Sequence, residues 1–247
     1  MTDVRRVLLG LWVALAAGGC AKSFREQIPT YPNMDAAASV NALVAQAKKV
    51  HTLNGQGLIT LTRPDGQSVR LDAAMAMQPP ERARFRAWKF GRGIFDLTVT
   101  PEGVWVVTPD DAGRKEQIRS AGVSAAKLAK TWSVLSGGFF ESPGLTNEER
   151  GGKLIARRQS GDEPVVVCEV DRRTLTPRKY SVLDDAGKAR FTLTMGHYRQ
   201  YGDVVWPTRL VAVSDGGTVE IVLNEVEVNP ELPPRAFVPP SRAEKLP

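Results

Sequence analysis

Alternation of apolar and polar residues at every second position is the strongest constraint that this sequence sets on its fold. The clearest case lies between residues 68 and 78, where the apolar positions are Val69, Leu71, Ala73, Met75 and Met77. Successive side chains of a β-strand point to opposite faces, so this pattern predicts a strand with one buried face. The Pro-Asp-Gly sequence at residues 64–66 is typical of a tight turn. We therefore expect residues 54–62 and 68–78 to form a hairpin.

Further stretches with strand character follow at short spacing. They cover residues 82–88, 94–100, 103–108, 153–159, 165–170, 178–183, 189–195, 204–213 and 218–228. Glycine-containing turns separate several of them, and such short connections join antiparallel neighbours rather than parallel ones. The sequence predicts a mainly β fold with few helices (α+β), built on an antiparallel sheet of about eleven strands.

Two helices interrupt this pattern. Asp35 is a good N-cap for a first helix, whose apolar residues Val40, Leu43, Val44 and Ala47 fall on one face. A second helix is expected to start near Ser124, to carry Leu128, Trp132 and Leu135, and to end at Gly137-Gly138. Both helices have an apolar stripe suited to packing on a sheet.

The first twenty residues have the layout of a secretory signal. Arg5 and Arg6 precede an apolar stretch at residues 7–17, and Gly18-Gly19 form a small-residue processing site. The apolar stretch is shorter than the roughly 20 residues that a membrane-spanning helix needs. We expect residues 1–19 to be a signal peptide, residues 20–34 a lipidated cysteine with a flexible tether, residues 35–240 the folded domain and residues 241–247 a C-terminal tail.

Cys20 ends this leader, and residues 17–20 (Ala-Gly-Gly-Cys) resemble the bacterial lipobox, in which the cysteine is acylated after cleavage. The resemblance implies a lipid anchor at Cys20. The alternative is an ordinary signal peptide with a chance cysteine. Ala21 stands where an aspartate would retain a lipoprotein in the inner membrane, so by the same resemblance we expect the outer membrane, with the domain facing the periplasm. If Cys20 is acylated, Cys168 has no intramolecular disulfide partner and is interpreted as a core residue.

The order of elements and the closing pattern resemble the LolA/LolB superfamily. The closing pattern consists of residues 226–230 (Val-Glu-Val-Asn-Pro) and residues 232–240 (Leu-Pro-Pro-Arg-Ala-Phe-Val-Pro-Pro). The resemblance implies a strongly curved antiparallel sheet that forms an incomplete barrel, short helices that cap its open side, and an interior that holds acyl chains. A chain with its own lipid anchor is nearest in layout to the outer-membrane lipoprotein receptor of this superfamily.

Two candidate sites follow from the resemblance. The inward-facing residues expected to contact acyl chains are Leu71, Met75, Met77, Phe85, Phe95, Leu97, Val99, Phe191, Leu193 and Met195. Methionine suits a variable ligand because its flexible side chain repacks easily. The alternative is that these residues fill a closed core. The second candidate is the loop at residues 88–95, where Trp88, Phe90, Gly91 and Ile94 stand at the place of the receptor's membrane- and cargo-contacting loop. Its alternative is a tight hairpin with Phe90 tucked inward.

Other chemistry has little support in this sequence. Arg82, Arg84 and Arg86 alternate along one strand face and would suit anionic headgroups, but basic residues on a solvent face are ordinary. No catalytic motif, metal-binding motif or cofactor fingerprint occurs, and the two histidines, His51 and His197, are isolated. We expect a protein that is not an enzyme, has no cofactor and does not bind nucleic acid. The first hypothesis is non-covalent binding of acyl chains or lipidated cargo in lipoprotein or lipid transfer. The second is a structural or envelope-stress sensory lipoprotein that binds a protein partner.

Overall fold

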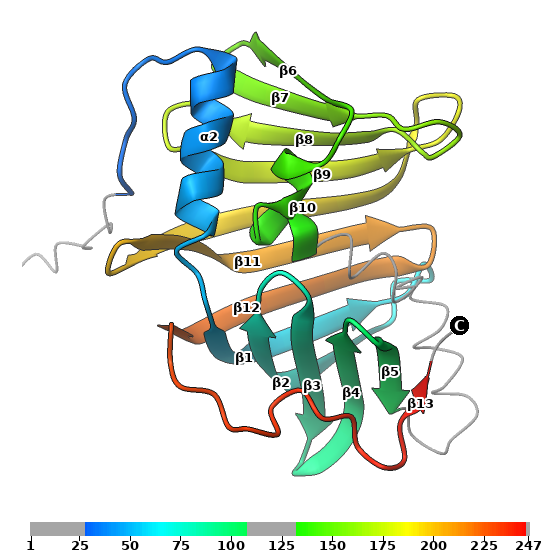
Figure 1. Ribbon diagram of the computed structural model, residues 1–247. Coiled ribbons are helices and arrows are strands. Elements are labelled where there is room, and N and C mark those ends of the chain that lie inside the picture. Colours follow the sequence, from blue (N-terminus) through cyan, green and yellow to red (C-terminus); the bar gives the residue numbers. More distant parts are fainter. Residues whose placement is uncertain (1–27, 108–131, 246–247) are drawn as a thin grey trace, which may run out of the picture.

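The structure is a computed structural model that describes residues 28–107 and 132–245. The described strands form one antiparallel sheet in the order β13-β5-β4-β3-β2-β1-β12-β11-β10-β9-β8-β7-β6 (Figure 1). The strands are β1 (Leu53–Thr62), β2 (Ser68–Gln78), β3 (Arg82–Lys89), β4 (Arg92–Thr100), β5 (Gly103–Val107), β6 (Leu145–Arg150), β7 (Lys153–Arg158), β8 (Val166–Asp171), β9 (Thr176–Leu183), β10 (Ala189–Tyr201), β11 (Val204–Ser214), β12 (Gly217–Val228) and β13 (Glu244–Lys245).

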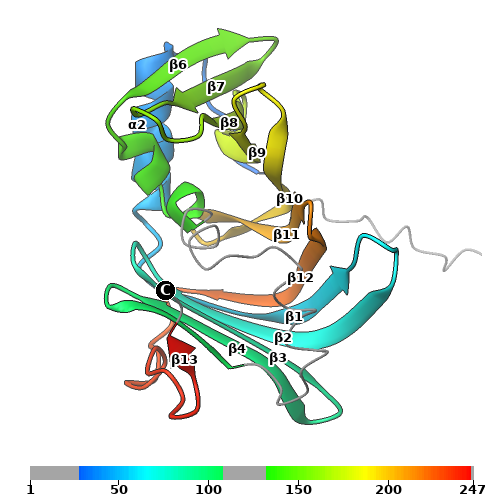
Figure 2. The same cartoon turned by 90° about the vertical axis from the view of Figure 1, so that its right-hand side faces the viewer.

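The sheet is strongly bent, and Figure 2 shows a C-shaped profile with the helical elements in its opening. The edge strands β6 and β13 do not pair with each other. The predicted fold class, an incomplete antiparallel barrel with few helices, is confirmed. The described sheet has 13 strands, more than the expected number, because β6 and β13 were not foreseen.

The predicted hairpin of β1 and β2 shows how local sequence positions the strands. Gly66 takes φ +85°, and the Asp65 carboxylate accepts a hydrogen bond from the Gln67 amide at 3.0 Å. The turn sets the register, in which Ile59 lies opposite Leu71 and Gly55 opposite Met75. Even-numbered side chains thus face outward and odd-numbered ones inward along both strands.

At the centre of the sheet, β1 pairs with β12, so two strands that are far apart in the sequence lie side by side. A bulge interrupts this pairing, so that Gln56 lies opposite Glu225 but Gly57 lies opposite Leu223. A Cβ atom at Gly57 would lie only 2.0 Å from the carbonyl oxygen of Val222. Glycine is therefore required at this point, where the two halves of the sheet, β1–β5 and β6–β12, meet.

Helix α2 (Ala36–Ala47) crosses in front of the upper strands in Figure 1 and covers the inner face of the sheet. Its predicted N-cap is confirmed, since the Asp35 carboxylate accepts a hydrogen bond from the Ala38 amide at 2.7 Å. Ser39, Val40 and Leu43 are its buried residues. This is the apolar stripe that the sequence indicated, shortened at its C-terminal end. Within the described ranges, no helix is both long and apolar enough to cross a bilayer.

The second predicted helix is described only in its last turn, and its expected start near Ser124 lies outside the described residues. Residues 132–135 are helical, and Gly137 takes φ +83°, in line with the predicted end. A short 3-10 helix, η1 (Gly138–Glu141), follows at once and buries Phe139 and Phe140. These elements and α2 together cap the open side of the sheet, and we call residues 36–47 and 132–141 the helical cap.

The segment before α2 is held against the fold. Arg172, which is 8% exposed, donates hydrogen bonds to the backbone carbonyls of Pro32 and Met34 and to the side chain of Asn33. The Tyr31 amide donates to the carbonyl of Arg173 at 2.8 Å. Residues 28–34 are thus docked, and the remainder of the predicted tether lies outside the described residues.

The segment after β12 runs along the outer side of the lower strands and ends in β13, which pairs with β5 (Figure 1). At its start, the Asn229 side chain accepts hydrogen bonds from the amides of His51 and Thr52 and donates one to the Lys49 carbonyl. Further along, Arg84 of β3 donates to the carbonyls of Ala236 and Val238. Backbone bonds within the segment, such as that from the Ala236 amide to the Pro233 carbonyl at 2.8 Å, complete its hydrogen bonding. This proline-rich segment is therefore fixed to the fold by side-chain hydrogen bonds at Asn229 and Arg84 and by the pairing of β13.

Candidate functional site

The inner face of the bent sheet gathers the ten residues predicted to line a cavity. One core cluster, which also takes in the helical cap, contains Met75, Met77, Phe85, Leu97, Val99, Phe191, Leu193 and Met195. A second, smaller cluster contains Leu71 with Ile59, Ala73 and Ala87, and Phe95 is partly buried against both clusters. The alternation in sequence thus placed these side chains on one face, and their contact with a ligand stays a prediction.

A small apolar cavity lies between the two clusters. It measures about 10 Å³ and is lined by Ile59, Ala73, Ala74, Met75, Phe85, Arg86, Ala87, Phe95, Ile221 and Leu223. This volume is at the limit for a single water molecule, and an apolar cavity of this kind stays dry. In this conformation the side chains on both sides of the cavity form a packed core, so an acyl chain would have to displace some of them.

Aromatic rings join the helical cap to the sheet. The ring of Trp132 stacks on that of Phe85, with centroids 4.8 Å apart and planes inclined by 26°. Phe139 makes an edge contact with Tyr180 at 5.7 Å, and Tyr180 in turn contacts Phe191 at 6.5 Å. The sequence signalled only Trp132, through its place in a helical stripe; the roles of Phe139 and Tyr180 had no pattern of their own.

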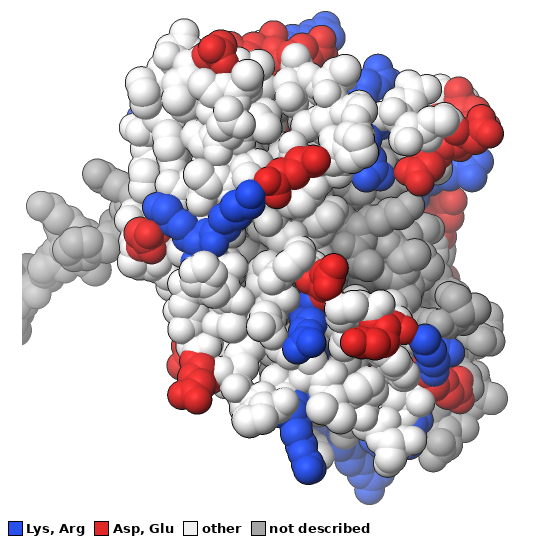
Figure 3. All heavy atoms as spheres, viewed as in Figure 1, with Lys and Arg blue, Asp and Glu red and all other residues white. Residues whose placement is uncertain are grey.

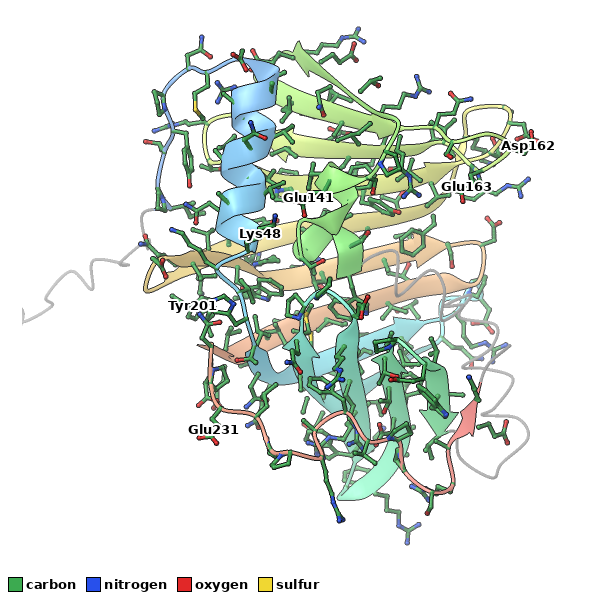
Figure 4. The ribbon with its side chains drawn as sticks, viewed as in Figure 1. Lys48, Glu141, Asp162, Glu163, Tyr201 and Glu231 are labelled. Carbon is green, nitrogen blue, oxygen red and sulfur yellow. The ribbon has the colours of Figure 1, made fainter. Side chains whose placement is uncertain are left out.

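An ion pair closes the cap at its surface. Lys48, just after α2, lies 2.6 Å from the Glu141 carboxylate of η1 (Figure 4). Both side chains are about half exposed, at 61% and 48%, so the pair contributes little to stability. Packing of the apolar rings, rather than charge, holds the cap on the sheet.

Two buried indole N–H groups have no hydrogen-bond partner. They belong to Trp132, which is 5% exposed, and to Trp206 of β11, which is 2% exposed. A buried tryptophan usually finds an acceptor for its N–H group. These two donors are therefore unsatisfied polar atoms of the interior, as is the hydroxyl oxygen of the fully buried Thr98.

Two ionisable side chains of the interior, Cys168 and Tyr180, favour their neutral forms. Burial, together with the nearby Glu169 carboxylate, raises the pKa of the Cys168 thiol. Burial likewise raises the pKa of Tyr180 to about 12. Because only a thiolate is a strong nucleophile, Cys168 is a core residue, as the sequence indicated.

The loop between β3 and β4 presents an aromatic side chain to solvent. Phe90 is 91% exposed, and the turn takes φ +51° at Phe90 and +73° at Gly91. The alternative of a hairpin with Phe90 tucked inward does not hold. Trp88 and Ile94, by contrast, are half-buried, and Ile94 packs against the smaller cluster. Of the four predicted loop residues, Phe90 and Gly91 are therefore the ones at the tip.

Basic residues next to this loop have a structural use. Arg84 forms a two-pronged ion pair with Asp96, with hydrogen bonds of 2.9 and 2.7 Å. Arg82 and Arg86 are exposed.

Acidic and basic side chains are interspersed over the face drawn in Figure 3, and neither sign forms a continuous patch there. Within residues 28–107 and 132–245, no group of three or more His, Cys, Asp and Glu side chains is placed to hold a metal ion.

Comparison with known proteins identifies the fold. No protein-family model and no curated protein matches this sequence. A solved structure of a DUF1329 family protein from Desulfovibrio piger is similar, with a TM-score of 0.60 at 10% identity over 83% of this chain and 98% of that chain. A putative outer membrane lipoprotein-sorting protein domain from Vibrio parahaemolyticus gives 0.56 at 13% identity over 83% and 97%. A LolA superfamily protein from Nitrosomonas europaea gives 0.53 at 13% identity over 81% and 97%.

The chain therefore has the LolA-type fold that its order of elements indicated. At these identities the likeness establishes the fold alone.

Proposed function

We propose that this protein is a lipoprotein of the bacterial outer membrane, anchored through Cys20 and facing the periplasm, that binds acyl chains or lipidated cargo without a covalent bond. The observation that carries this proposal is the inner face of the sheet, where three flexible methionines, Met75, Met77 and Met195, are each at most 2% exposed beneath a cap held by apolar packing. The lipoprotein-sorting description of one similar structure is consistent with it.

Acyl chains would enter at the small apolar cavity of the core. The apolar cavity separates the two clusters, and Met75, Phe85 and Phe95 form part of its wall. Methionine changes rotamer at small cost, and the described residues of the cap take no part in the strand pairing of the sheet. Movement of these side chains and of the cap enlarges the cavity without breaking any strand pair.

Filling the cavity provides the test. Native mass spectrometry of the Cys20→Ser chain, purified without detergent, is expected to show bound lipid. Ala73→Leu adds a side chain on the cavity wall and should remove the bound lipid, whereas Ala76→Leu, on the outer face of the same strand, should leave it. Lipid retained equally in both variants, or absent from the parent protein, would contradict acyl-chain binding at this site.

Phe90 supplies a second, membrane-facing part of the proposal. Burial of one phenylalanine in an apolar phase contributes about 1.5–3 kcal/mol, so Phe90→Ser should weaken association of the Cys20→Ser chain with phospholipid vesicles by at least about tenfold. Val69→Ser, which removes another exposed apolar side chain, is the matched control. Equal losses in the two variants would show that the loop has no special role.

A second candidate function is binding of a protein partner, and one observation favours it. Strand β6 pairs only with β7 in the described part of the chain, so its other edge is available to an added strand. Crosslinking from Thr146 and Glu148 of β6 in intact cells should then capture one envelope protein. Its capture together with an absence of bound lipid would favour this function over the first.

A further inference from the structure

The turn between β3 and β4 contains residues that do not favour its own stability. Phe90 and Gly91 both take positive φ angles in this two-residue turn, for which Asn-Gly is the favoured sequence. Lys89 and Arg92, on either side of the turn, are exposed and lie directly opposite each other. Like charges placed in this way repel each other. Because the Phe90 side chain is 91% exposed, packing within the domain does not account for these choices.

A third basic side chain comes to this turn from the C-terminal segment. Nη2 of Arg242 lies 4.0 Å from the position that a Cβ atom would occupy at Gly93. Figure 1 shows the C-terminal segment passing beside the lower ends of β3 and β4, where the turn lies. Arg242 is exposed, so its guanidinium is available at the surface. We call the following group of residues the basic tip: Lys89, Phe90, Gly91, Arg92 and Arg242.

The three cations of the basic tip have no acidic partner among the described residues. None of them takes part in an ion pair there. Strands β2, β3 and β4 contain two acidic residues, Asp72 and Asp96. Asp96 is bound to Arg84, and Asp72 lies opposite Trp88, before the turn. The tip therefore carries positive charge that the neighbouring strands do not compensate.

The size and shape of the basic tip decide which partner fits it. A protein interface of standard size buries about 800 Å² on each partner, and a two-residue turn is too small to provide this area. A phospholipid bilayer needs no complementary surface. An apolar side chain enters the boundary between headgroups and acyl chains, and basic side chains beside it are attracted to anionic headgroups. The exposed Phe90 ring with cations on both sides has this arrangement.

We infer that the basic tip binds bilayers that contain anionic phospholipids, with Phe90 inserted at the boundary of the acyl chains and Lys89, Arg92 and Arg242 in contact with headgroup phosphates. This inference rests on the membrane-facing part of the proposed function and extends it, because it states the charge of the lipid. It also assigns a use to the docked C-terminal segment, which brings Arg242 to the turn.

Co-sedimentation with vesicles measures the preference for charge. The Cys20→Ser chain is mixed with vesicles of phosphatidylcholine alone, or of phosphatidylcholine and phosphatidylglycerol in equal parts. It should bind the anionic vesicles at least about tenfold more tightly, because each cation near an anionic surface adds to the attraction. Added sodium chloride should reduce this preference, since salt screens exposed charges.

Lys89→Gln, Arg92→Gln and Arg242→Gln, made together in the Cys20→Ser chain, remove the charge and keep Phe90. Binding to the anionic vesicles should fall at least about thirtyfold, since one cation at such a surface accounts for roughly fivefold. Binding to the neutral vesicles should change by less than about twofold, because Phe90 is retained. Thermal unfolding checks that the variant is folded.

The matched control carries Arg150→Gln, Arg157→Gln and Arg173→Gln. These three arginines are exposed, belong to no ion pair of the described residues, and lie on β6, β7 and the turn between β8 and β9. The control loses the same net charge as the first variant. It should keep its affinity for the anionic vesicles within about threefold of the parent, because the lost charges lie away from the tip.

Phe90→Asn separates membrane binding from turn formation. Asparagine is favoured at this position of the turn, so the urea midpoint of the variant should rise. Its binding to both kinds of vesicle should fall at least about tenfold, because the inserted ring is lost. A lower urea midpoint would show that Phe90 stabilises the turn, which would overturn the argument for an external partner.

Two results of the vesicle experiments would overturn the inference. Equal binding of the parent to neutral and anionic vesicles would show that the lipid charge is not recognised, and the proposed membrane contact would stand if Phe90→Asn weakened both. Equal losses in the two triple variants would reduce the effect to net charge. Absence of parent binding to either kind of vesicle would overturn both the inference and the membrane-facing part of the proposed function.

Discussion

Each of the two end segments of the described chain is held by an arginine side chain, but the carboxylate partners of the two arginines differ in their exposure to solvent. The N-terminal segment, residues 28–34, docks on Arg172, and the C-terminal segment, residues 229–245, docks on Arg84. Arg84 has a partner, Asp96, that is only 15% exposed, whereas the Glu149 partner of Arg172 is 41% exposed. The arginines themselves differ in the opposite sense, since the Arg172 side chain is 9% exposed and that of Arg84 17%. The two sites therefore differ chiefly in the carboxylate partner, which is enclosed at Arg84 and largely solvated at Arg172.

An arginine suits this role because of its five donors. One side of the guanidinium binds a carboxylate of the sheet, and the remaining N–H groups bind carbonyls of the passing segment. Both segments contain prolines and, apart from β13, lie outside the regular strand ladder, so their carbonyls need such partners.

Arg84→Met should produce the largest loss of stability. It leaves the Asp96 carboxylate, which is 15% exposed, without its partner and removes the donors to Ala236 and Val238. We therefore expect the free energy of unfolding to fall by about 2–3 kcal/mol. Urea denaturation measures the change. Arg82→Met, an exposed position on the same face of β3, should change it by less than about 0.5 kcal/mol. Similar losses in both variants would remove the distinction between the two arginines.

Arg172→Met should have a smaller global effect and a strong local one. Glu149 remains solvated in the variant, so the expected loss is about 1–2 kcal/mol. Hydrogen exchange at the Tyr31 amide, which donates to the Arg173 carbonyl, should become much faster because the segment detaches. Arg173→Met changes an exposed neighbour and serves as the control. Slow exchange at Tyr31 in Arg172→Met would mean that other contacts hold the segment.

Asn229→Gly should have the smallest effect of the three. Glycine accepts the φ of +59° found at Asn229 but loses the side-chain bonds to residues 49–52, for an expected loss of about 1 kcal/mol. Asn229→Ala loses the same bonds and also places a Cβ atom at a positive φ, so it should be less stable than the glycine variant by a further 1 kcal/mol or so. The reverse order would show that backbone conformation is unimportant here.

The regular parts of the fold could be predicted because their signals are local. The alternation in β2, the turn at residues 63–66 and the Asp35 cap each depend on residues close together in the chain. The two missed strands lack such a signal. β6 has the polar sequence Leu-Thr-Asn-Glu-Glu-Arg, typical of a protected edge, and β13 has only two residues that become a strand by pairing with β5.

The candidate site was less predictable, because its state depends on residues distant in the sequence. Alternation placed Phe85 and Met75 on the inner face, but whether that face is open or filled is decided by Trp132 and Phe139 of the cap. The exposure of the Phe90 side chain to solvent could not be predicted from the sequence either. It follows from the positive φ angles at the tip of the turn, which a list of residue types does not contain.

The pairing of β1 with β12 sets the order in which the sheet is assembled. Hairpins within each half connect neighbours in the chain and close small loops, whereas the central pair joins residues 53–62 to residues 218–228. Closing so large a loop costs more entropy and is slow, so the two halves are expected to form first as separate meanders. Each then carries one unpaired inner edge, β1 or β12, that would invite association with other chains. A single late step conceals both edges, and the Gly57 bulge is where the two finished halves must fit together.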